Sequence, residues 1–321
     1  MILILSTPND DDTNIVMEHL SILGQKCIRI NDLDIFTGNT KMYYDVTPEP
    51  TLIVENDFFG KINLANVNCV WYRKFGFFHK FKDKLLGEKN LEILEYLKSE
   101  HTAILDLFFD FLKDKKWLNN YVNVKKLTKI DTLIQSGKIG LSTPKTIITN
   151  YNDKSLLNKE YITKSVRDGA LIDVNEKTFF FMTQEVKLNI IKKYNNFFPS
   201  LFQEKITKEY ELRIFHLNGK NYPMAIFSQN DKQTKTDYRH YNYNKPNRVI
   251  PYCLPDEIDQ KITQLMLALG LDTGSLDMIK GTDGKYYFLE VNPSGQFRMT
   301  SFPCNYNLHY EVAQYLKNIN S

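Results

Sequence analysis

The sequence predicts an α/β protein built from two or three subdomains. Its 321 residues exceed the usual ~100–200 residues of one domain, and 42% of them are apolar, which is enough for a substantial core. A strand, a helix and a second strand follow one another at the N-terminus, whereas short antiparallel strands fill the second half of the chain. We therefore expect an open α/β domain first and α+β regions after it, with boundaries at 1–118, 119–200 and 201–321.

The N-terminal region begins with an apolar run at Met1–Leu5. A helix follows that Asn9–Asp12 can cap and that should end near Leu23, because Gly24 supplies a stop signal. Apolar alternation resumes at Cys27–Ile30. This order predicts an open sheet whose first strand is central and buried.

Three further segments complete this region. Val67–Arg73 is expected to be a strand whose Trp71 and Tyr72 lie in the core. The apolar positions of Glu88–Lys116 follow the period of a long amphipathic helix. Trp117–Asn120 is then expected to link the first region to the second.

The second region should begin with a helix over Asn123–Ser136, ended by Gly137 and Gly140, and an extended segment over Lys145–Thr149. Hydrophobic alternation and turn residues then predict three short antiparallel strands and a helix. The strands span Ile162–Val166, Ala170–Val174 and Thr178–Phe181, and the helix spans Thr183–Tyr194.

The C-terminal region combines antiparallel strands with one helix. Asn218-Gly219 is a strong hairpin signal, and the polar stretch Ser228–Arg248 is the best candidate for a mobile surface loop. The expected strands are Phe202–Ile206, Glu211–Leu217, Asn221–Ser228, Leu271–Lys280 and Lys285–Val291, and the helix runs from Pro255 to Leu269.

Composition excludes several classes of protein. The 41 Lys and Arg against 38 Asp and Glu give a net charge of only +3, which argues against nucleic-acid binding through basic tails. Aromatic residues make up 13% of the chain and exclude wholesale disorder. No apolar run approaches the ~20 residues that cross a bilayer, so we expect no membrane association and a cytoplasmic protein. The four cysteines lack metal-site spacing, and buried free thiols are expected.

The last hairpin carries the strongest chemical signal. If Asp283-Gly284 forms a two-residue turn, Asp277 lies directly opposite Glu290, with Cβ atoms ~4.5–5.5 Å apart, and Asn292 shares their face. Two carboxylates and an amide oxygen repel one another unless a cation lies between them, and such oxygen ligands favour Mg²⁺. A metal bridged to phosphate is the favoured interpretation, and a solvated hairpin face with chance acidic residues is the alternative.

Leu276–Ile279 and Phe288–Phe297 together resemble the metal-binding end of the ATP-grasp carboxylate ligases. More narrowly, they resemble the branch that makes microviridin-type and grasp-with-spasm graspetides. The resemblance also covers Val70–Arg73, Asn123–Thr149 and nearly everything from Phe202 onward. It implies an ATP-grasp fold with an N-terminal α/β domain, a small central domain and a C-terminal ATP-grasp domain.

The resemblance also assigns residues that bind the nucleotide and the metal. Lys126, with Lys125 as the off-by-one alternative, and Lys164 match the two nucleotide-binding lysines of the family. The sequence departs from the family pattern at Lys164-Ser165, where Lys-Pro is usual, and the glycine-rich loop is reduced to Gly169. The metal ligands would be Asp277, Glu290 and Asn292, and the adenine hinge and the residues after it would be Gln203, Glu204, Ile206, Lys208 and Glu209.

Two acidic-x-Arg elements are candidates for catalysis. Glu211-Leu212-Arg213 resembles one motif of the family, and alternation places Glu211 and Arg213 on one face, where Arg213 can clamp a carboxylate or an acyl phosphate. The alternative is a structural ion pair. Asp237-Tyr238-Arg239 resembles a second element near the peptide site, with a solvated loop as the alternative; Asp237 and Arg239 would act there.

The resemblance implies an ATP- and Mg²⁺-dependent peptide macrocyclase, with two metal ions. Asp or Glu side chains of a ribosomally made precursor peptide would be activated as acyl phosphates and joined to Ser, Thr or Lys side chains. A leader segment would dock on Ala170–Phe181 and Thr183–Tyr194, and a homodimer is expected. Two alternatives stay open: a ligase that acts on small molecules or protein termini, and a peptide-binding protein without turnover.

Overall fold

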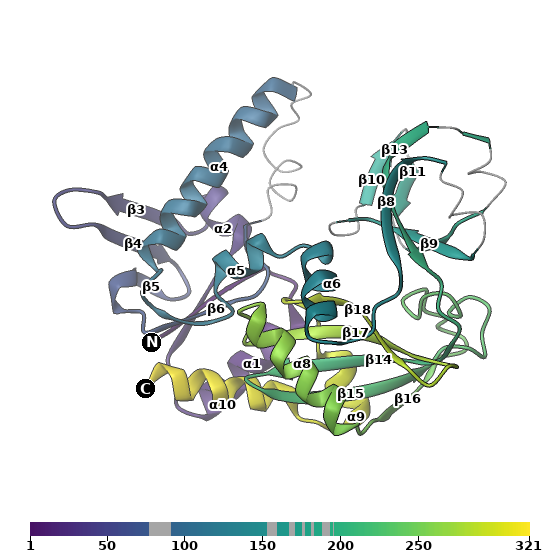
Figure 1. Ribbon diagram of the computed structural model, residues 1–321. Coiled ribbons are helices and arrows are strands. Elements are labelled where there is room, and N and C mark those ends of the chain that lie inside the picture. The colour runs from purple at the N-terminus through teal and green to yellow at the C-terminus, as the bar shows by residue number, and fades with distance from the viewer. Residues whose placement is uncertain are drawn as a thin grey trace. The chain divides into compact units, whose positions relative to one another are not determined.

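The computed structural model describes residues 1–76, 91–152, 159–166, 171–174, 177–180, 183–187, 193–194 and 196–321. The chain divides into two compact units. The first contains Met1–Val124, Gln296–Ser301 and Asn307–Ser321, and the second contains Lys125–Gly295 and Phe302–Tyr306. The C-terminal helix therefore belongs to the same unit as the N-terminal strand, as the colours of Figure 1 help to follow. The three-part division at residues 118 and 200 stays a prediction.

The first unit is built on a parallel four-stranded sheet in the order β2-β1-β6-β7. β1 (Ile2–Ser6) and β6 (Cys69–Tyr72) are buried at every residue, and β2 (Cys27–Asn31) pairs with β1. The prediction of a central, buried first strand is confirmed. The expected link at Trp117–Asn120 is wrong in part, because β7 (Lys116–Leu118) pairs in parallel with β6.

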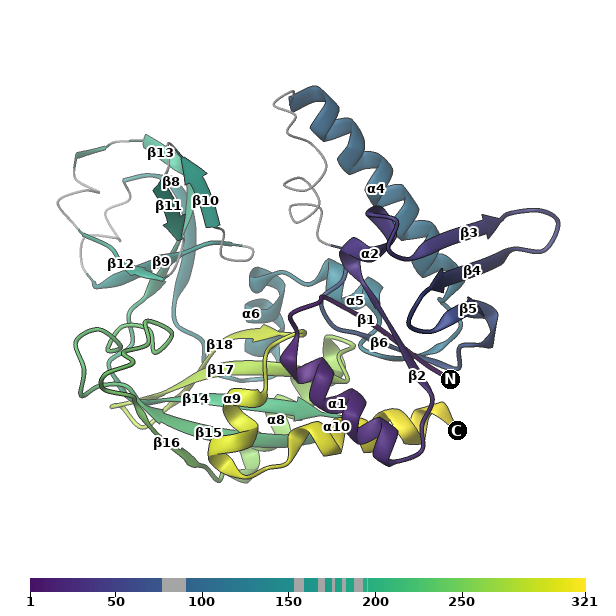
Figure 2. The same ribbon diagram turned by 180° about the vertical axis from the view of Figure 1, so that it is seen from behind.

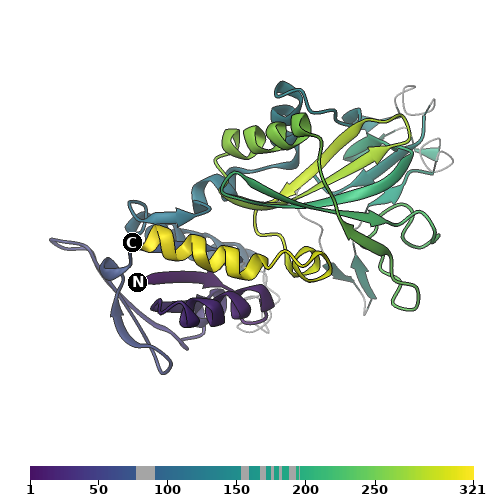
Figure 3. The ribbon, with the colours of Figure 1, turned by 90° about the horizontal axis from the view of Figure 1, so that it is seen from below.

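Three helices cover this sheet and form the core with it. α1 (Asp11–Ile22) and α10 (Leu308–Asn320) pack side by side, as Figures 2 and 3 show. α4 (Leu91–Phe111), predicted as part of Glu88–Lys116, contributes Phe108 to the hydrophobic core. The two ends of the chain thus stabilise one another within one unit.

A three-stranded antiparallel sheet in the first unit was absent from the predictions. It consists of β3 (Lys41–Asp45), β4 (Thr51–Asn56) and β5 (Gly60–Asn63), in that order. Alternate residues of β4 are buried, which is the pattern of a strand with one covered face. Two short helical segments flank this sheet in the sequence, α2 (Asp32–Phe36) and η1 (Leu64–Asn66).

The second unit contains a four-stranded sheet in the order β12-β9-β13-β8. Its strands are β8 (Thr146–Tyr151), β9 (Tyr161–Lys164), β12 (Gln184–Glu185) and β13 (Asn196–Glu204). A separate antiparallel hairpin consists of β10 (Leu171–Val174) and β11 (Lys177–Phe180). The helix expected over Thr183–Tyr194 is wrong at its start, where β12 pairs with β9, and most of its remainder lies outside the described residues.

A five-stranded antiparallel sheet forms the other half of the second unit, in the order β16-β15-β14-β17-β18. Asn218 and Gly219 both have positive φ, 46° and 82°, so the predicted hairpin turn between β14 and β15 is confirmed. The strands are β14 (Lys208–Leu217), β15 (Lys220–Phe227), β16 (Arg248–Pro251), β17 (Thr273–Gly281) and β18 (Tyr286–Asn292).

Two helices of the second unit pack against this sheet and against each other. α6 (Lys129–Lys138) contacts β18, and α8 (Asp256–Ala268) contacts β15 (Figure 1). The single helix expected over Asn123–Ser136 is wrong, because α5 (Tyr121–Lys126) ends first and the Thr128 side chain then caps α6. The chain ends with α9 (Arg298–Cys304) and α10.

Two predictions about the whole chain concern membranes and cysteines. Among the residues the structure describes, no helix is long and apolar enough to span a membrane. All four cysteines are free; Cys69 and Cys304 are buried, whereas Cys27 is half-buried and Cys253 is exposed. The expectation of buried thiols is therefore wrong for Cys253.

Candidate active site

The last hairpin brings Asp277 opposite Glu290, as predicted, but the turn and the strand register that do so differ from the prediction. Lys280 pairs with Tyr286, one residue out of the register that a two-residue turn at Asp283-Gly284 would give. A β-bulge at Leu289 then shifts the ladder back, so that Asp277 and Glu290 are Cα partners. The predicted turn is wrong, and the predicted pairing is confirmed because the two deviations cancel.

The Asp277 carboxylate is held from two sides. Arg213 lies opposite it on β14, and its Nη1 donates to both carboxylate oxygens at 2.9 Å. The Tyr238 hydroxyl donates to Oδ1 at 3.2 Å. Burial disfavours the charged guanidinium, but the Asp277 carboxylate raises the pKa of Arg213 above its usual value. Burial, together with Asp277, also raises the pKa of Tyr238, so this phenol stays a neutral donor.

The Glu290 carboxylate is surrounded by three cations. Lys164 Nζ lies 3.3 Å from it, Arg239 Nη1 lies 3.4 Å away and Lys129 Nζ lies 3.7 Å away. Burial alone would raise the pKa of Glu290, but Lys164, Lys129 and Arg239 lower it to about 2. Glu290 is therefore ionised at neutral pH, and both members of the predicted carboxylate pair are contacted by cationic side chains.

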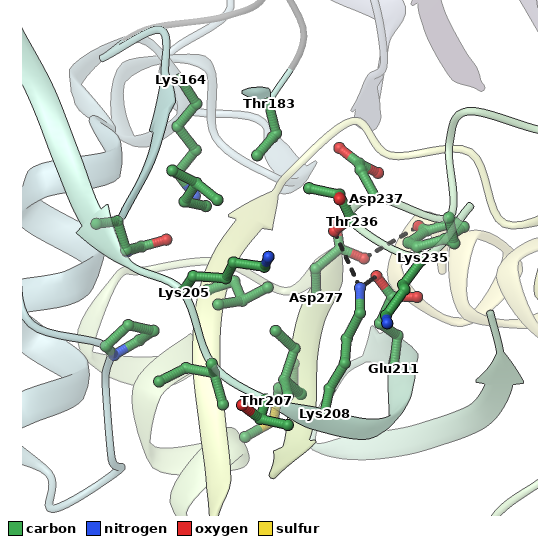
Figure 4. A pocket seen from close by; sticks show the side chains of 18 of the residues that line it. Lys164, Thr183, Lys205, Thr207, Lys208, Glu211, Lys235, Thr236, Asp237 and Asp277 are labelled. Atoms are coloured by element: carbon green, nitrogen blue, oxygen red, sulfur yellow. Dashed lines mark hydrogen bonds and ion pairs between the residues drawn. The ribbon is translucent and has the colours of Figure 1, made fainter. Parts of the chain in front are cut away.

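These carboxylates line a cavity of about 350 Å³ within the second unit (Figure 4). Its wall combines apolar side chains with charges of both signs. Ten of the predicted site residues line it: Lys164, Gln203, Glu204, Ile206, Lys208, Glu211, Asp237, Arg239, Asp277 and Glu290. Apolar wall residues that were not predicted are Ile162, Leu212, Met278, Ile279 and Leu289.

Glu211 faces this cavity in a buried polar network. Its carboxylate accepts hydrogen bonds from Lys208 Nζ and from the Ser228 hydroxyl, and Lys208 also donates to the carbonyl oxygen of Thr236 at 3.0 Å (Figure 4). Burial raises the pKa of Glu211 in spite of Lys208. In the described ion pairs, Glu211 is joined to Lys208 and Arg213 is joined to Asp277. The two charged residues of the Glu211-Leu212-Arg213 motif therefore belong to two separate ion pairs.

The loop between β15 and β16 covers one side of the cavity. It was expected to be a mobile surface loop, but Ser228 and Thr234 in it are fully buried. The Asp237 carboxylate accepts hydrogen bonds from Arg239 at 2.7–3.1 Å. Burial alone would raise the pKa of Asp237, but Arg239 lowers it below its usual value. The solvated-loop alternative is therefore wrong for Asp237 and Tyr238, which are buried, whereas Arg239 is exposed.

Four predicted site residues lie outside the cavity wall. Lys126 and Glu209 are exposed, and Arg213, which is not in the wall, binds Asp277. Asn292 is exposed, and its side-chain oxygen accepts the N–H of Ser294 at 3.0 Å. Their nucleotide or metal roles stay predictions. The reduced glycine-rich loop at Arg167-Asp168-Gly169 lies outside the described residues.

Lys129 is the main site residue that sequence reasoning missed. It occupies the first position of α6, and its Nζ reaches both Glu290 and, at 3.3 Å, the carbonyl oxygen of Ser165. The signal that could have identified it is Thr128, a good helix cap one residue earlier. Because a second helix begins after Thr128, Lys129 rather than Lys126 reaches the Glu290 carboxylate.

The strand end expected to bind adenine is well ordered by its neighbours. The backbone N–H of Glu204 donates to the carbonyl oxygen of Lys145 at 2.8 Å, and the backbone N–H of Lys205 donates to the carbonyl oxygen of Glu160 at 2.9 Å. Gln203 is fully buried beside the cavity, and its Oε1 has no hydrogen-bond partner. A buried acceptor near apolar side chains and cations fits a purine nucleotide with its phosphates, and the carboxylate pair fits Mg²⁺.

Comparison with known proteins agrees with this site. Residues 1–125 match the family model described as the MvdD pre-ATP grasp domain. The chain is similar to a RiPP-associated ATP-grasp ligase of Chryseobacterium gregarium, determined with ADP and a leader and core peptide: 26% identity, TM-score 0.82, covering 99% of this chain and 96% of the other. No curated protein matches the sequence.

Two further solved structures share the fold. The macrocyclase MdnC of Microcystis aeruginosa MRC, bound with precursor peptide MdnA, is 24% identical with a TM-score of 0.83 over 99% of both chains. The ATP-grasp ligase PsnB, complexed with minimal precursor, Mg and ADP, is 17% identical with a TM-score of 0.73 over 100% of this chain and 97% of the other.

The fold and the cavity together define an ATP-grasp ligase, an ATP-dependent enzyme. Within that class, the first 125 residues match the MvdD pre-ATP grasp domain, and over its whole length the chain is similar to a RiPP-associated ATP-grasp ligase. The resemblance drawn from its C-terminal hairpin is confirmed.

Proposed function

We propose that the protein is a peptide macrocyclase. It activates Asp or Glu side chains of a ribosomally made precursor as acyl phosphates and joins them to Ser, Thr or Lys side chains as ω-esters or ω-amides. The observation that carries this proposal is the pairing of Asp277 with Glu290, two carboxylates that are each contacted by cationic side chains from other segments of the second unit. Such a site can hold a metal–phosphate group and a substrate carboxylate together.

Joining a carboxylate to an alcohol or amine is uphill in water, because the carboxylate is a poor electrophile. ATP with Mg²⁺ supplies the γ-phosphoryl group that turns the carboxylate oxygen into a leaving group. Asp277 and Glu290 would hold the metal, and Lys164 and Lys129, which now neutralise Glu290, would turn to the phosphates. The protein contributes positioning and electrostatic stabilisation rather than a nucleophile of its own.

Arg239 is placed to bind the substrate carboxylate. It is held by Asp237 and lies 3.4 Å from Glu290, while 45% of its side chain stays exposed at the mouth of the site. An arginine that is oriented by one carboxylate and reaches another can exchange the second for a substrate carboxylate without losing its position. We propose Arg213 as the residue that orients Asp277, since the two face each other across β14 and β17.

The precursor peptide is proposed to dock through a leader segment on the β10–β11 hairpin and the segment after it. The backbone of this hairpin supports the expected strands, and parts of both segments lie outside the described residues. A homodimer, a cytoplasmic location and the use of two Mg²⁺ ions also stay predictions.

Intact-mass measurement tests the proposed reaction. The protein is incubated with ATP, Mg²⁺ and a precursor encoded beside it, and each closed ring should remove one water. Glu290→Gln should abolish the loss while the protein still captures the peptide. If peptides keep their mass but ADP forms with free amino acids or protein termini, the small-molecule ligase would replace the macrocyclase. Retained peptide binding without ADP formation in either protein would indicate a binding protein.

A further inference from the structure

The loop between β15 and β16 is tied to both of the larger sheets of the second unit. From the five-stranded sheet, Lys208 Nζ donates to the carbonyl oxygen of Thr236 at 3.0 Å, and the Tyr238 hydroxyl donates to Asp277 at 3.2 Å (Figure 4). From the four-stranded sheet, Oε1 of Glu185 accepts the Thr236 hydroxyl at 2.7 Å. Thr236 is therefore bound through its backbone from one sheet and through its side chain from the other.

The backbone that carries Glu185 is fixed in its sheet. Glu185 is the Cα partner of Ile162 on β9, and Ile162 lines the cavity. The N–H of the next residue, Val186, donates to the carbonyl oxygen of Tyr161 at 2.8 Å, and Val186 packs in the apolar cluster of Tyr161. Glu185 is thus a rigidly placed acceptor at the rim of the cavity, although half of its side chain is exposed.

The Glu185 carboxylate is oriented by a second partner. Lys205 Nζ lies 2.9 Å from the same oxygen, Oε1, that accepts the Thr236 hydroxyl. The Thr236 hydroxyl and Lys205 together lower the pKa of Glu185, so this carboxylate is ionised at neutral pH and can only accept hydrogen bonds. A hydrogen bond to a charged acceptor is stronger than one between neutral groups, which favours a lasting contact with the loop.

The loop residues that follow Thr236 lead directly to the candidate substrate arginine. Asp237 is the next residue, and its carboxylate holds Arg239 through hydrogen bonds of 2.7–3.1 Å. Nη2 of Arg239 also donates to the hydroxyl of Thr183 at 3.4 Å, two residues before Glu185. A displacement of Thr236 would therefore move Asp237 and turn Arg239 away from its place at the mouth of the cavity.

We propose that Glu185 is a positioning residue for the substrate carboxylate. It holds Thr236, and the loop fixed in this way presents Arg239 to the substrate through Asp237. Glu185 acts at the rim and does not contact the reacting atoms. This assignment rests on the proposed function, in which Arg239 binds the carboxylate that is to be activated.

Hydrogen exchange followed by mass spectrometry tests the contact without a substrate. Glu185→Met removes the carboxylate and keeps the apolar length of the side chain. Exchange of peptides from the loop should then rise about threefold to tenfold, the effect of one net hydrogen bond. Glu185→Gln keeps an acceptor for Thr236 and should stay close to the natural protein. Peptides from β14 report on global stability and should exchange alike in all variants.

Glu160→Met is the matched control. The Glu160 side chain is 80% exposed and pairs with Lys205 at 3.2 Å, but no contact given by the described residues joins it to the loop. This variant removes the same charge from the surroundings of Lys205 and should leave loop exchange and activity unchanged. Thr236→Val removes the other partner of the contact, so the double variant with Glu185→Met should behave like either single variant.

Ring closure supplies the functional result. The precursor encoded beside the protein is used at a series of concentrations with ATP and Mg²⁺, and its loss of water is followed by intact mass. Glu185→Met should lower kcat/KM for the peptide about threefold to tenfold, while the calorimetric affinity for ADP with Mg²⁺ stays that of the natural protein.

Three results would overturn the assignment of Glu185 alone. Loop exchange could stay unchanged in Glu185→Met, or it could rise without any fall of kcat/KM. An equal loss of ADP affinity would show that Glu185 supports the fold as a whole rather than the position of Arg239. Absence of ring closure by the natural protein would instead contradict the proposed function.

Discussion

The Tyr238 hydroxyl and the Asp277 carboxylate lie 3.2 Å apart, which ties the loop between β15 and β16 to the middle of β17. The same oxygen, Oδ1, also accepts from Arg213. Asp277 is therefore oriented by a loop residue and a strand residue together. A carboxylate fixed in this way is already in position for the metal that we propose it binds, which lowers the cost of building that site.

Tyr238→Phe removes only the loop side of this arrangement. Because the ring is buried and stays in place, we expect stability to fall by only about 0.5–1.5 kcal/mol, the value of one net hydrogen bond, and the Mg²⁺ requirement for ADP binding to rise about three- to tenfold. Calorimetric ADP titrations at a series of Mg²⁺ concentrations measure this. Tyr243→Phe in the same loop is the control, because Tyr243 is 87% exposed. Equal Mg²⁺ dependence of all three proteins would show that Tyr238 does not position Asp277.

The two candidate lysines before β8 can be separated by substitution. Lys129 contacts Glu290 and is half-buried, whereas Lys126 is exposed. Lys129→Met should therefore weaken ADP binding about tenfold or more, as expected for loss of a hydrogen bond to a charged group. Lys126→Met should weaken it less, and Lys138→Met, at the exposed end of α6, serves as the reference. The opposite order of Lys126 and Lys129 would restore the assignment made from sequence.

Gly295 is required by close packing at the end of β18. A Cβ atom there would lie 2.6 Å from Cβ of Ser275 and 3.1 Å from Nη2 of Arg213. Gly295→Ala should lower the free energy of unfolding by about 1–3 kcal/mol, and Ser275→Gly in the same chain should recover part of the loss. Urea denaturation measures both. Gly137→Ala is the control, because it has open space and a helical position, and it should be neutral or slightly stabilising.

Acid should destabilise the first unit through Asp10. Burial would raise its pKa, but Arg73 and Lys74 lower it from 3.8 to about 2. A lowered carboxyl pKa contributes stability that is complete above pH 3.8 and is lost as the pH falls toward 2.

Asp10→Asn should therefore flatten the dependence of stability on pH across this window. It should also lower stability at neutral pH, since Arg73 is buried and would lose part of its compensation. Thermal unfolding followed from pH 2 to pH 7 measures both effects. Asp57 lies on the exposed surface of the same unit, so Asp57→Asn should show the same dependence of stability on pH as the natural protein. A slope that stays unchanged in Asp10→Asn would assign the acid sensitivity to other carboxylates.

Local patterns predicted most of the strands and the acidic pair, because alternation and turn residues act over a few positions. The pairing of Asp277 with Glu290 was nevertheless correct for an incomplete reason. A hairpin turn and a bulge at Leu289 each shift the register by one residue, and neither has a distinctive residue in the sequence. Pairing predicted from a single turn is therefore safest within a few residues of that turn.

The residues that were missed depend on contacts between segments far apart in the chain. Lys129 reaches Glu290 from a helix that begins after Thr128, and the buried Ser228 hydroxyl donates to Glu211 on another strand. The unpredicted sheet around β4 likewise depends on the burial of alternate β4 residues in the hydrophobic core of the first unit. Sequence periodicity does not report such partners, since they are chosen by tertiary packing.

The placement of α10 beside α1 has a consequence for the order of folding on the ribosome. The sheet residues up to Leu118 emerge early, but the helix that covers part of this sheet is synthesised only after the whole second unit. Until then an apolar surface next to β6 stays open to chaperones or to neighbouring chains. Slow or interrupted translation of the last residues should therefore harm the N-terminal half of the protein more than the ligase half.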